Sequence, residues 1–190
     1  MTYDVILADP PWSFEVWDKE TGHGRSPESH YATMPLSDIK ALKIPANGNA
    51  ALFMWAVWPS LPDAFEVIRE WGFTYKTVAW VWAKANESGF GHHMGMGYYT
   101  RANTEPCLLA VRGTMAVAAH DVLALIYSPV REHSRKPDEQ YDKIERLYPG
   151  RRYLELFARH KRPGWHAWGN EVDSDVKIET ASADFSGGGR

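Results

Sequence analysis

The first apolar run of the chain stops at an aspartate and two prolines, in the stretch "YDVILADPPW" that begins at Tyr3. Residues 3–8 are mostly apolar or β-branched, which is typical of a buried strand in a parallel sheet. Proline has a fixed φ and no backbone N–H, so Pro10 and Pro11 cannot extend such a strand. The run therefore places Asp9 at the carboxyl end of a buried strand, where open α/β sheets bind their ligands.

The rest of the chain alternates strand-like and helix-like patterns. Further strands are predicted over residues 50–57, 76–83, 105–113, 121–128 and 151–158. Residues 59–73 and 136–148 have helical periodicity, each with a proline in the first turn. This alternation predicts an α/β fold with a mostly parallel sheet. We expect a single domain over residues 1–173, because 190 residues support one core, and a flexible tail over residues 174–190.

Composition excludes several classes of protein. The net charge is −3, whereas a domain that grips nucleic acid alone usually has a basic excess, so any such contact is expected to be local or shared with a second copy or a partner subunit. The sequence has no apolar run of 18 residues and no basic signal-peptide start, which predicts no membrane span. A single cysteine, Cys107, rules out an internal disulfide and favours the cytoplasm. His92 and His93 are adjacent, with no cysteine or acidic pair nearby, so no metal is expected.

Two long stretches without regular periodicity, residues 13–35 and 86–105, are rich in glycine, histidine and aromatic residues. Loops of this length in a compact domain are usually functional or disordered. The second loop ends with Tyr98, Tyr99 and Arg101, which could meet a substrate strand. The alternative is an ordinary lid.

The turn after the first strand has an unusual chemical character. Asp9 offers a carboxylate, the two prolines leave carbonyls without neighbouring N–H donors, and Trp12 adds a flat aromatic ring. A site of acceptors and one stacking face matches the exocyclic amine of a planar base. Accepting both hydrogens of that amine would also free its lone pair to act as a nucleophile. The alternative is a strand-to-loop turn with a capping aspartate and a packed tryptophan.

Several motifs together carry a family resemblance. "DPPW" is followed in order by "HYATMPLSDIKALKIP", "EPCLLAVRG", "KPDEQYDKIERLYPG", "ELFAR" and "GWHAWGNE". Over residues 3–172 the chain resembles the MT-A70-like family of S-adenosylmethionine-dependent N6-adenine methyltransferases, in a compact form like that of bacteria and phages. The resemblance implies a class I methyltransferase fold. Its Rossmann-like sheet would have about seven mostly parallel strands in circularly permuted order, with the catalytic motif before the cofactor motifs.

The resemblance also assigns residues. Asp9, Pro10, Pro11 and Trp12 match the catalytic motif: Asp9 and the Pro10 carbonyl would hold the target amine, and Trp12 would bound the base pocket. Tyr31 matches an aromatic residue that gates the active site. The residues implied to bind S-adenosylmethionine are Asp9, Lys136, Arg159, His160, Asn170 and Glu171. From the residues alone, Lys136 could equally be a solvated lysine, and "RHKR" a solvated basic patch.

The function expected from these observations is transfer of a methyl group from S-adenosylmethionine to the N6 amine of adenine, in DNA rather than RNA. The amine would attack the methyl group directly, and orientation and electrostatics would supply most of the rate. One alternative keeps the chemistry but moves it to RNA adenine or to cytosine N4. Another is a catalytically silent scaffold subunit that binds nucleic acid beside an active partner.

Overall fold

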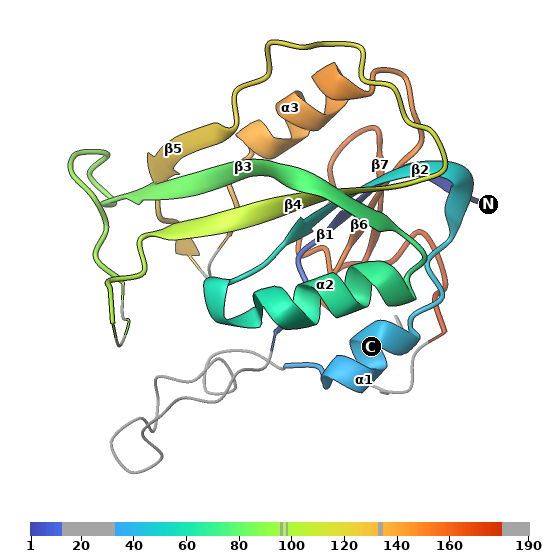
Figure 1. Cartoon of the computed structure of the whole chain (residues 1–190), viewed down its shortest axis with the longest axis horizontal. Helices are drawn as coiled ribbons and strands as arrows, with labels where there is room; N and C mark the ends of the chain where they lie inside the picture. Colours follow the sequence, from blue (N-terminus) through green and yellow to red (C-terminus); the bar gives the residue numbers. More distant parts are fainter. Residues whose placement is uncertain (13–32, 96, 98, 133–134, 180–190) are drawn as a thin grey trace.

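The computed structural model of the chain describes residues 1–12, 33–95, 97, 99–132 and 135–179. Within these residues one sheet contains all seven named strands: β1 (Tyr3–Ala8), β2 (Ala46–Trp55), β3 (Thr74–Ala85), β4 (Thr104–Arg112), β5 (Leu125–Pro129), β6 (Tyr153–Leu156) and β7 (Trp165–Trp168). The helices are α1 (Leu36–Ala41), α2 (Leu61–Glu70) and α3 (Glu139–Leu147), with a 3₁₀ turn over Trp58–Ser60. Figure 1 shows how these elements follow one another along the chain.

The strand order is β5-β3-β4-β2-β1-β6-β7. β4 runs antiparallel to both of its neighbours, β2 and β3, and the other pairs are parallel. β1 therefore lies near the centre of the sheet, and β6 and β7 pair beside it although they come last in the chain. The expected α/β fold of the class I methyltransferase type, with a mostly parallel sheet, is confirmed.

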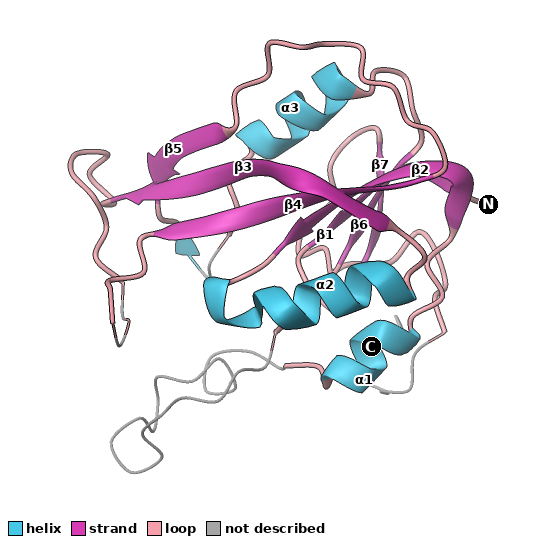
Figure 2. Ribbon diagram, viewed as in Figure 1, coloured by secondary structure: helices cyan, strands magenta, loops and turns pink. Residues whose placement is uncertain are grey.

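Helices cover both faces of the sheet (Figure 2). Alternate residues of the central strands face opposite ways, because side chains alternate along a strand. Ile6 and Met54 pack with the α1 and α2 side, whereas Leu7 and Phe53 pack with the α3 side. The core therefore has two halves, one on each face of β1 and β2.

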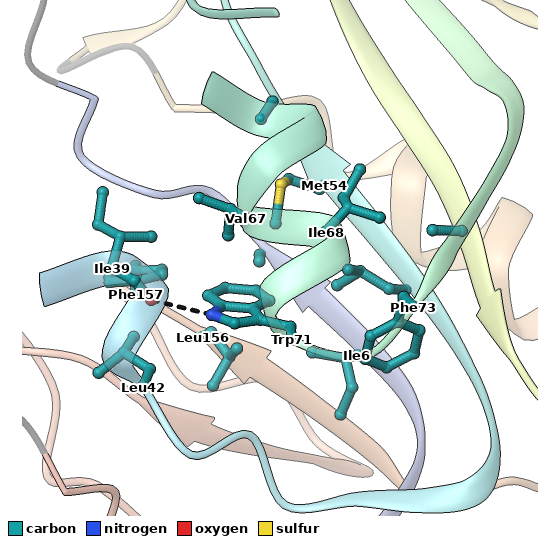
Figure 3. Close-up of a cluster of buried hydrophobic side chains, with 14 of the residues drawn as sticks. Ile6, Ile39, Leu42, Met54, Val67, Ile68, Trp71, Phe73, Leu156 and Phe157 are labelled. Atoms are coloured by element: carbon teal, nitrogen blue, oxygen red, sulfur yellow. Dashed lines mark hydrogen bonds between the residues drawn. The ribbon is translucent and has the colours of Figure 1, made fainter. Parts of the chain in front are cut away.

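Trp71 joins the two helices on one face. Its ring is 3% exposed, and its indole N–H donates a hydrogen bond of 2.9 Å to the carbonyl of Ile39 in α1 (Figure 3). The bond satisfies the polar group of a buried tryptophan. This contact and the burial of Ile39 and Leu42 stabilise the short helix α1. The sequence pattern did not predict this helix.

Two predicted strands are shorter in the structure. The strand expected over 121–128 begins only at Leu125, which pairs with Val81 of β3. The strand expected over 151–158 is β6, Tyr153–Leu156. It ends at Phe157, whose φ of 61° leaves the extended region.

The residues after β7 pack on the domain as far as Ile178. Asp175 accepts a hydrogen bond of 2.9 Å from the backbone N–H of Ala167 and pairs with Lys161 at 2.7 Å. Ile178 is 7% exposed and Val176 packs against the same core half. The expectation of a flexible tail from residue 174 therefore does not describe residues 174–179, and residues 180–190 lie outside the described part.

Candidate active site

Asp9 lies at the rim of a cavity of about 310 Å³ at the carboxyl ends of β1 and β6. Lys136, Arg159 and His160, three of the residues expected to bind the cofactor, also line this cavity. They come from the segment before α3 and the turn after β6, so the fold brings together residues that are up to 151 positions apart (160 − 9). The ligand-binding end of the sheet predicted from the first strand therefore carries a cavity in the structure.

Lys136 is the centre of the charge arrangement. Its Nζ lies 2.9 Å from Asp9 Oδ2 and 3.3 Å from Glu105 Oε2, and 5.7 Å from the ring centre of Trp55. Glu105 also pairs with Lys84 of β3. Four charges of alternating sign, Lys84, Glu105, Lys136 and Asp9, therefore cross the sheet edge from β3 to β1.

The neighbours of Lys136 and Glu105 in this row favour the charged forms of these two residues. Burial opposes the charge on Lys136, but the neighbouring Asp9 and Glu105 carboxylates outweigh it and raise the pKa of the ammonium. Burial likewise opposes the charge on Glu105, and the Lys136 and Lys84 ammonium groups lower its pKa. The site thus holds a fixed cation against the carboxylate of Asp9.

The structure adds two features to the acceptor site expected at this turn. Lys136 donates a hydrogen bond to Asp9. The Pro10 carbonyl is partly used, because it accepts the backbone N–H of Trp12 at 2.8 Å. A carbonyl oxygen has two lone pairs, so this bond leaves one of them unused, but Pro10 is buried and does not line the cavity. The sequence reading could not place Lys136 beside Asp9, because it depends on tertiary contact.

Trp12 packs into the core instead of presenting an open ring. Its side chain is 6% exposed, and its indole N–H donates to the carbonyl of Trp55 at 3.0 Å. This bond ties the end of β1 to the end of β2. Trp12 is therefore a packed tryptophan, which was the alternative raised from the sequence, and its ring is not fully exposed for stacking.

The turn after β6 forms the other side of the cavity. Phe157 takes a left-handed backbone conformation, and the Ala158 N–H donates to the Trp168 carbonyl at 2.9 Å. A Cβ on Gly169 would lie 2.2 Å from the carbonyl oxygen of Ala158, so only glycine allows this close approach. Arg159 lies 3.6 Å from Glu171, which brings the residues after β6 and β7 together. Asn170 and Glu171 are exposed, and Glu171 lies next to the cavity lining through its contact with Arg159.

A family model described as MT-A70 matches residues 3–171. The chain belongs to the MT-A70 family. The family expected from the sequence motifs is confirmed, and with it the expected class of enzyme, a methyltransferase. The matched region spans all seven strands of the sheet and every residue of the candidate site named above.

The MT-A70 relatives include bacterial and eukaryotic proteins. The chain is 33% identical over 197 residues to the type II methyltransferase M.MunI of Mycoplasma sp, covering 94% of this chain and 82% of that protein. It is 33% identical to a putative N(6)-adenosine-methyltransferase MT-A70-like protein of Medicago truncatula, over 93% of this chain and 27% of that one. It is 30% identical to the human N(6)-adenosine-methyltransferase catalytic subunit METTL3, over 90% of this chain and 28% of that protein. The chain thus spans only about a quarter of these two eukaryotic relatives.

Glu155 was not among the site residues predicted from the sequence, although it lines the same cavity as Asp9. Both of its carboxylate oxygens accept from the Tyr141 hydroxyl, at 3.1 and 3.0 Å. Burial is the main cause that raises the pKa of Glu155 to about 7; nearby Asp9 and Asp138 raise it further, and the Tyr141 hydrogen bond opposes the shift. The sequence signal that could have indicated Glu155 is its position at the start of "ELFAR", two residues before Phe157. Glu155 also lies two residues after Tyr153, so both side chains are on the same side of β6.

Replacing Glu155 with glutamine should stabilise the protein above neutral pH. The folded state holds a proton on Glu155 that the unfolded state releases between pH 4.5 and about 7, so folding stability falls as the pH rises through that window. Glutamine removes this penalty, and we expect a gain of about 2 kcal/mol at pH 8 that shrinks toward zero as the pH falls to 4.5. Thermal melts of both proteins across this range measure it. Glu139→Gln, at an exposed position of α3, is the matched control for exchanging a glutamate for a glutamine.

The residues expected to meet the substrate are only partly described. Tyr31 and Tyr98 lie outside the described residues. Tyr99 is 94% exposed and Arg101 is exposed. Both lie on the loop between β3 and β4, which begins at the carboxyl end of β3, a strand that runs in the same direction as β1 but ends seven residues further along (Figure 1).

Within the described ranges, no helix has the length and apolarity needed to cross a membrane. The same residues contain no group of three or more histidine, cysteine, aspartate or glutamate side chains that could hold a metal ion. His92 instead packs edge-on against the ring of Tyr127, with ring centres 5.8 Å apart.

Proposed function

We propose that this protein transfers a methyl group from S-adenosylmethionine to the N6 amine of adenine, and that its preferred target is DNA. The observation that carries the proposal is the Asp9–Lys136 ion pair at the rim of a cavity of about 310 Å³. A carboxylate that is fixed but partly exposed can accept from an amine, and the cavity beside it is within the size range of small-molecule sites.

The residues around the cavity fit the cofactor. S-adenosylmethionine supplies an activated methyl group on a sulfonium, together with a carboxylate, an ammonium and a ribose. Lys136 and Arg159 offer cations for the carboxylate, and Asp9 offers a carboxylate for the ammonium. Asn170 and Glu171, after β7, offer an amide and a carboxylate suited to vicinal hydroxyls.

In this proposal the protein contributes orientation and charge. Asp9 accepts a hydrogen of the target amine and aims its nitrogen into the cavity. Lys136 fixes the Asp9 carboxylate, and the hydrogen bond from Trp12 to Trp55 fixes the turn. A strong base is unnecessary, because the amine can lose its proton after the methyl group is transferred. Preorganised polar groups of this kind contribute most when water is excluded.

The choice of DNA is supported by the type II methyltransferase of Mycoplasma, because this chain matches 82% of the length of that protein. The second candidate is adenine in RNA, which the relatives named N(6)-adenosine-methyltransferases favour. A silent scaffold role is disfavoured, since the Asp9–Lys136 pair and the "DPPW" turn are both intact.

The test of the target is methyl transfer to DNA and RNA oligonucleotides of one sequence, followed by mass spectrometry of the nucleosides. We expect N6-methyladenine in the DNA at a higher initial rate than in the RNA. A higher rate on RNA would move the assignment to the second candidate, and methylcytosine alone would overturn the choice of adenine.

We also expect unpaired adenine to be methylated faster than paired adenine. The amine can reach Asp9 only if the base leaves the helical stack, which costs a few kcal/mol in a duplex and much less in a single strand. The net charge of −3 offers little general attraction for phosphates to offset this cost. Initial rates on matched single- and double-stranded oligonucleotides at two salt concentrations measure the preference. Faster methylation of fully paired DNA at both concentrations would refute it.

A further inference from the structure

The two edges of the sheet differ in what the described residues place beside them. β7 forms one edge and β5 the other (Figure 1). At the β7 edge, the Ala167 N–H donates to the Asp175 carboxylate at 2.9 Å, and the Ala167 carbonyl accepts the Asp175 N–H at 2.8 Å. Among the described residues, no strand lies beyond β5. An edge of this kind presents unpaired N–H and C=O groups to which another strand can bind.

The hydrogen bonds between β5 and β3 determine which backbone groups of β5 face outward. The Val81 N–H of β3 donates to the Ala124 carbonyl at 3.1 Å, and the register pairs Val81 with Leu125. In a parallel ladder, a strand uses alternate residues toward one neighbour. The even-numbered residues of β5 therefore bond to β3, and the backbone N–H and C=O groups of Leu125 and Tyr127 point away from the sheet.

The side chains along this edge are apolar and partly exposed. Leu123 is 74% exposed, Leu125 is 55% exposed and Tyr127 is 47% exposed. Leu125 and Tyr127 are two positions apart, so their side chains lie on the same face of β5. Residues 122–130 contain no charged side chain, whereas open edge strands usually carry charges that discourage pairing with another strand. Pro129, which has no N–H, limits pairing only at the end of β5.

The β5 edge is complementary to a second copy of itself in the antiparallel direction. In an antiparallel ladder, two residues that face each other exchange both backbone hydrogen bonds. Leu125 of one copy can therefore pair with Tyr127 of the other, and a two-fold axis at Ile126 generates the same pair again. In a parallel ladder each residue bonds to the two neighbours of the residue opposite it, so a two-fold axis cannot relate two copies that both use Leu125 and Tyr127. The antiparallel direction also brings Asp121 of each copy toward Arg131 of the other.

We propose that this protein forms a two-fold symmetric dimer in which the β5 strands of two copies pair antiparallel and join the two sheets into one. The exposed side chains of Leu123, Leu125 and Tyr127 then lie beside those of the second copy, so the contact buries apolar surface as well as pairing the edge. Because β5 has only five residues, we expect an interface at the low end of the usual sizes, below about 1,200 Å² in total. A dissociation constant of about 10–100 µM is typical of such a contact.

The dimer leaves both candidate active sites open. β5 and β1 run in the same direction, so antiparallel pairing turns the carboxyl ends of the two β1 strands toward opposite ends of the joined sheet. The two Asp9 cavities then open in opposite directions. The inference therefore does not depend on the proposed function and is tested without measuring methyl transfer.

Sedimentation and hydrogen exchange of the full chain test the pairing. Between about 1 and 200 µM, the mass in sedimentation should rise from 21.6 kDa toward twice that value. Over the same range, exchange of the Leu125 and Tyr127 backbone amides should slow by about 2-fold or more, because these amides enter hydrogen bonds only in the dimer. The Ala167 amide on the other edge is the internal control. Asp175 already accepts its hydrogen, so its exchange should not slow with concentration.

Two substitutions test the register. Leu125→Lys places two ammonium groups near the two-fold axis and should weaken the dimer at least about 10-fold. Combining Leu125→Lys with Tyr127→Glu sets each new ammonium opposite a new carboxylate of the second copy, and this variant should recover most of the association. Thr77→Lys is the control for adding a lysine, because Thr77 is exposed on β3 before its pairing with β5 begins. It should leave the dissociation constant unchanged.

A mass of 21.6 kDa at every concentration, with Leu125 and Tyr127 amides that exchange at a constant rate, would overturn the proposal. So would a dimer in which these two amides stay unprotected, or one that Leu125→Lys does not weaken. A combined variant that associates no better than Leu125→Lys alone would exclude the antiparallel register. If Leu125→Lys fails to fold, hydrogen exchange of the wild-type protein decides by itself.

Discussion

Replacing Asp9 with alanine is expected to abolish methyl transfer, lowering the rate by about 10³-fold or more while the protein stays folded. The substitution removes the acceptor that would orient the target amine, and orientation with fixed electrostatics supplies most of the rate in such reactions. The fold should persist, because Lys136 keeps Glu105 as a partner at 3.3 Å. Single-turnover rates with saturating S-adenosylmethionine measure the loss.

Two further variants make the result specific. Asp9→Asn keeps the size of the side chain but has a weaker acceptor, so it should retain less than about 1% of the wild-type rate. Asp121→Ala removes an exposed carboxylate that pairs with Arg146 away from the cavity, and it should leave the rate unchanged. Near wild-type turnover by purified Asp9→Ala would exclude Asp9 from the chemistry.

Replacing Lys136 with methionine should both weaken cofactor binding and destabilise the fold. The ammonium is shared by Asp9 and Glu105, so its loss leaves a buried glutamate with only Lys84 and an aspartate with no charged partner from this row. We expect about 2–3 kcal/mol of lost stability, below the full cost of an isolated buried charge, and a melting temperature roughly 5–10 °C lower. Calorimetric titration with S-adenosylmethionine should show binding at least about 10-fold weaker.

Asn170→Ala separates the two effects of the lysine substitution. Asn170 is exposed, so its loss should weaken cofactor binding without changing the melting temperature. Lys40→Met is the control for removing a lysine, since Lys40 pairs with Glu66 on the α1–α2 face and should not affect the cofactor. Unchanged dissociation constants for both Lys136→Met and Asn170→Ala would place the cofactor elsewhere.

Much of the fold could be predicted from the sequence because its signals are local. The apolar run before Asp9, the helical periodicity of residues 59–73 and the prolines that open both predicted helices report on neighbouring residues, and the structure confirms these elements. The predicted ends of the strands were less accurate where contacts with distant parts of the chain determine where a strand begins or ends. β5 starts at Leu125, where its pairing with β3 begins, and β6 ends before Phe157, which has a positive φ.

The candidate site was predicted less completely, because its chemistry depends on contacts across the fold. Lys136 was expected to bind the cofactor, but its ion pairs with Asp9 and Glu105 follow from the sheet order. Trp12 was expected to have an exposed ring, but its side chain is buried and its indole N–H donates a hydrogen bond to the carbonyl of Trp55. Glu155 gave no sequence signal strong enough to separate it from an ordinary strand residue. Its chemistry depends on burial beside Tyr141, which only the structure reveals.

The central claim is that Asp9 and the cavity beside it transfer a methyl group to adenine N6. The most direct measurement uses S-adenosylmethionine with a deuterated methyl group and a DNA strand with a single unpaired adenine, incubated with the wild-type protein and with Asp9→Asn. Nucleoside mass spectrometry should find the deuterated methyl group on adenine N6 with the wild-type protein and almost none with Asp9→Asn. Label on another base, or equal label with both proteins, would contradict the claim.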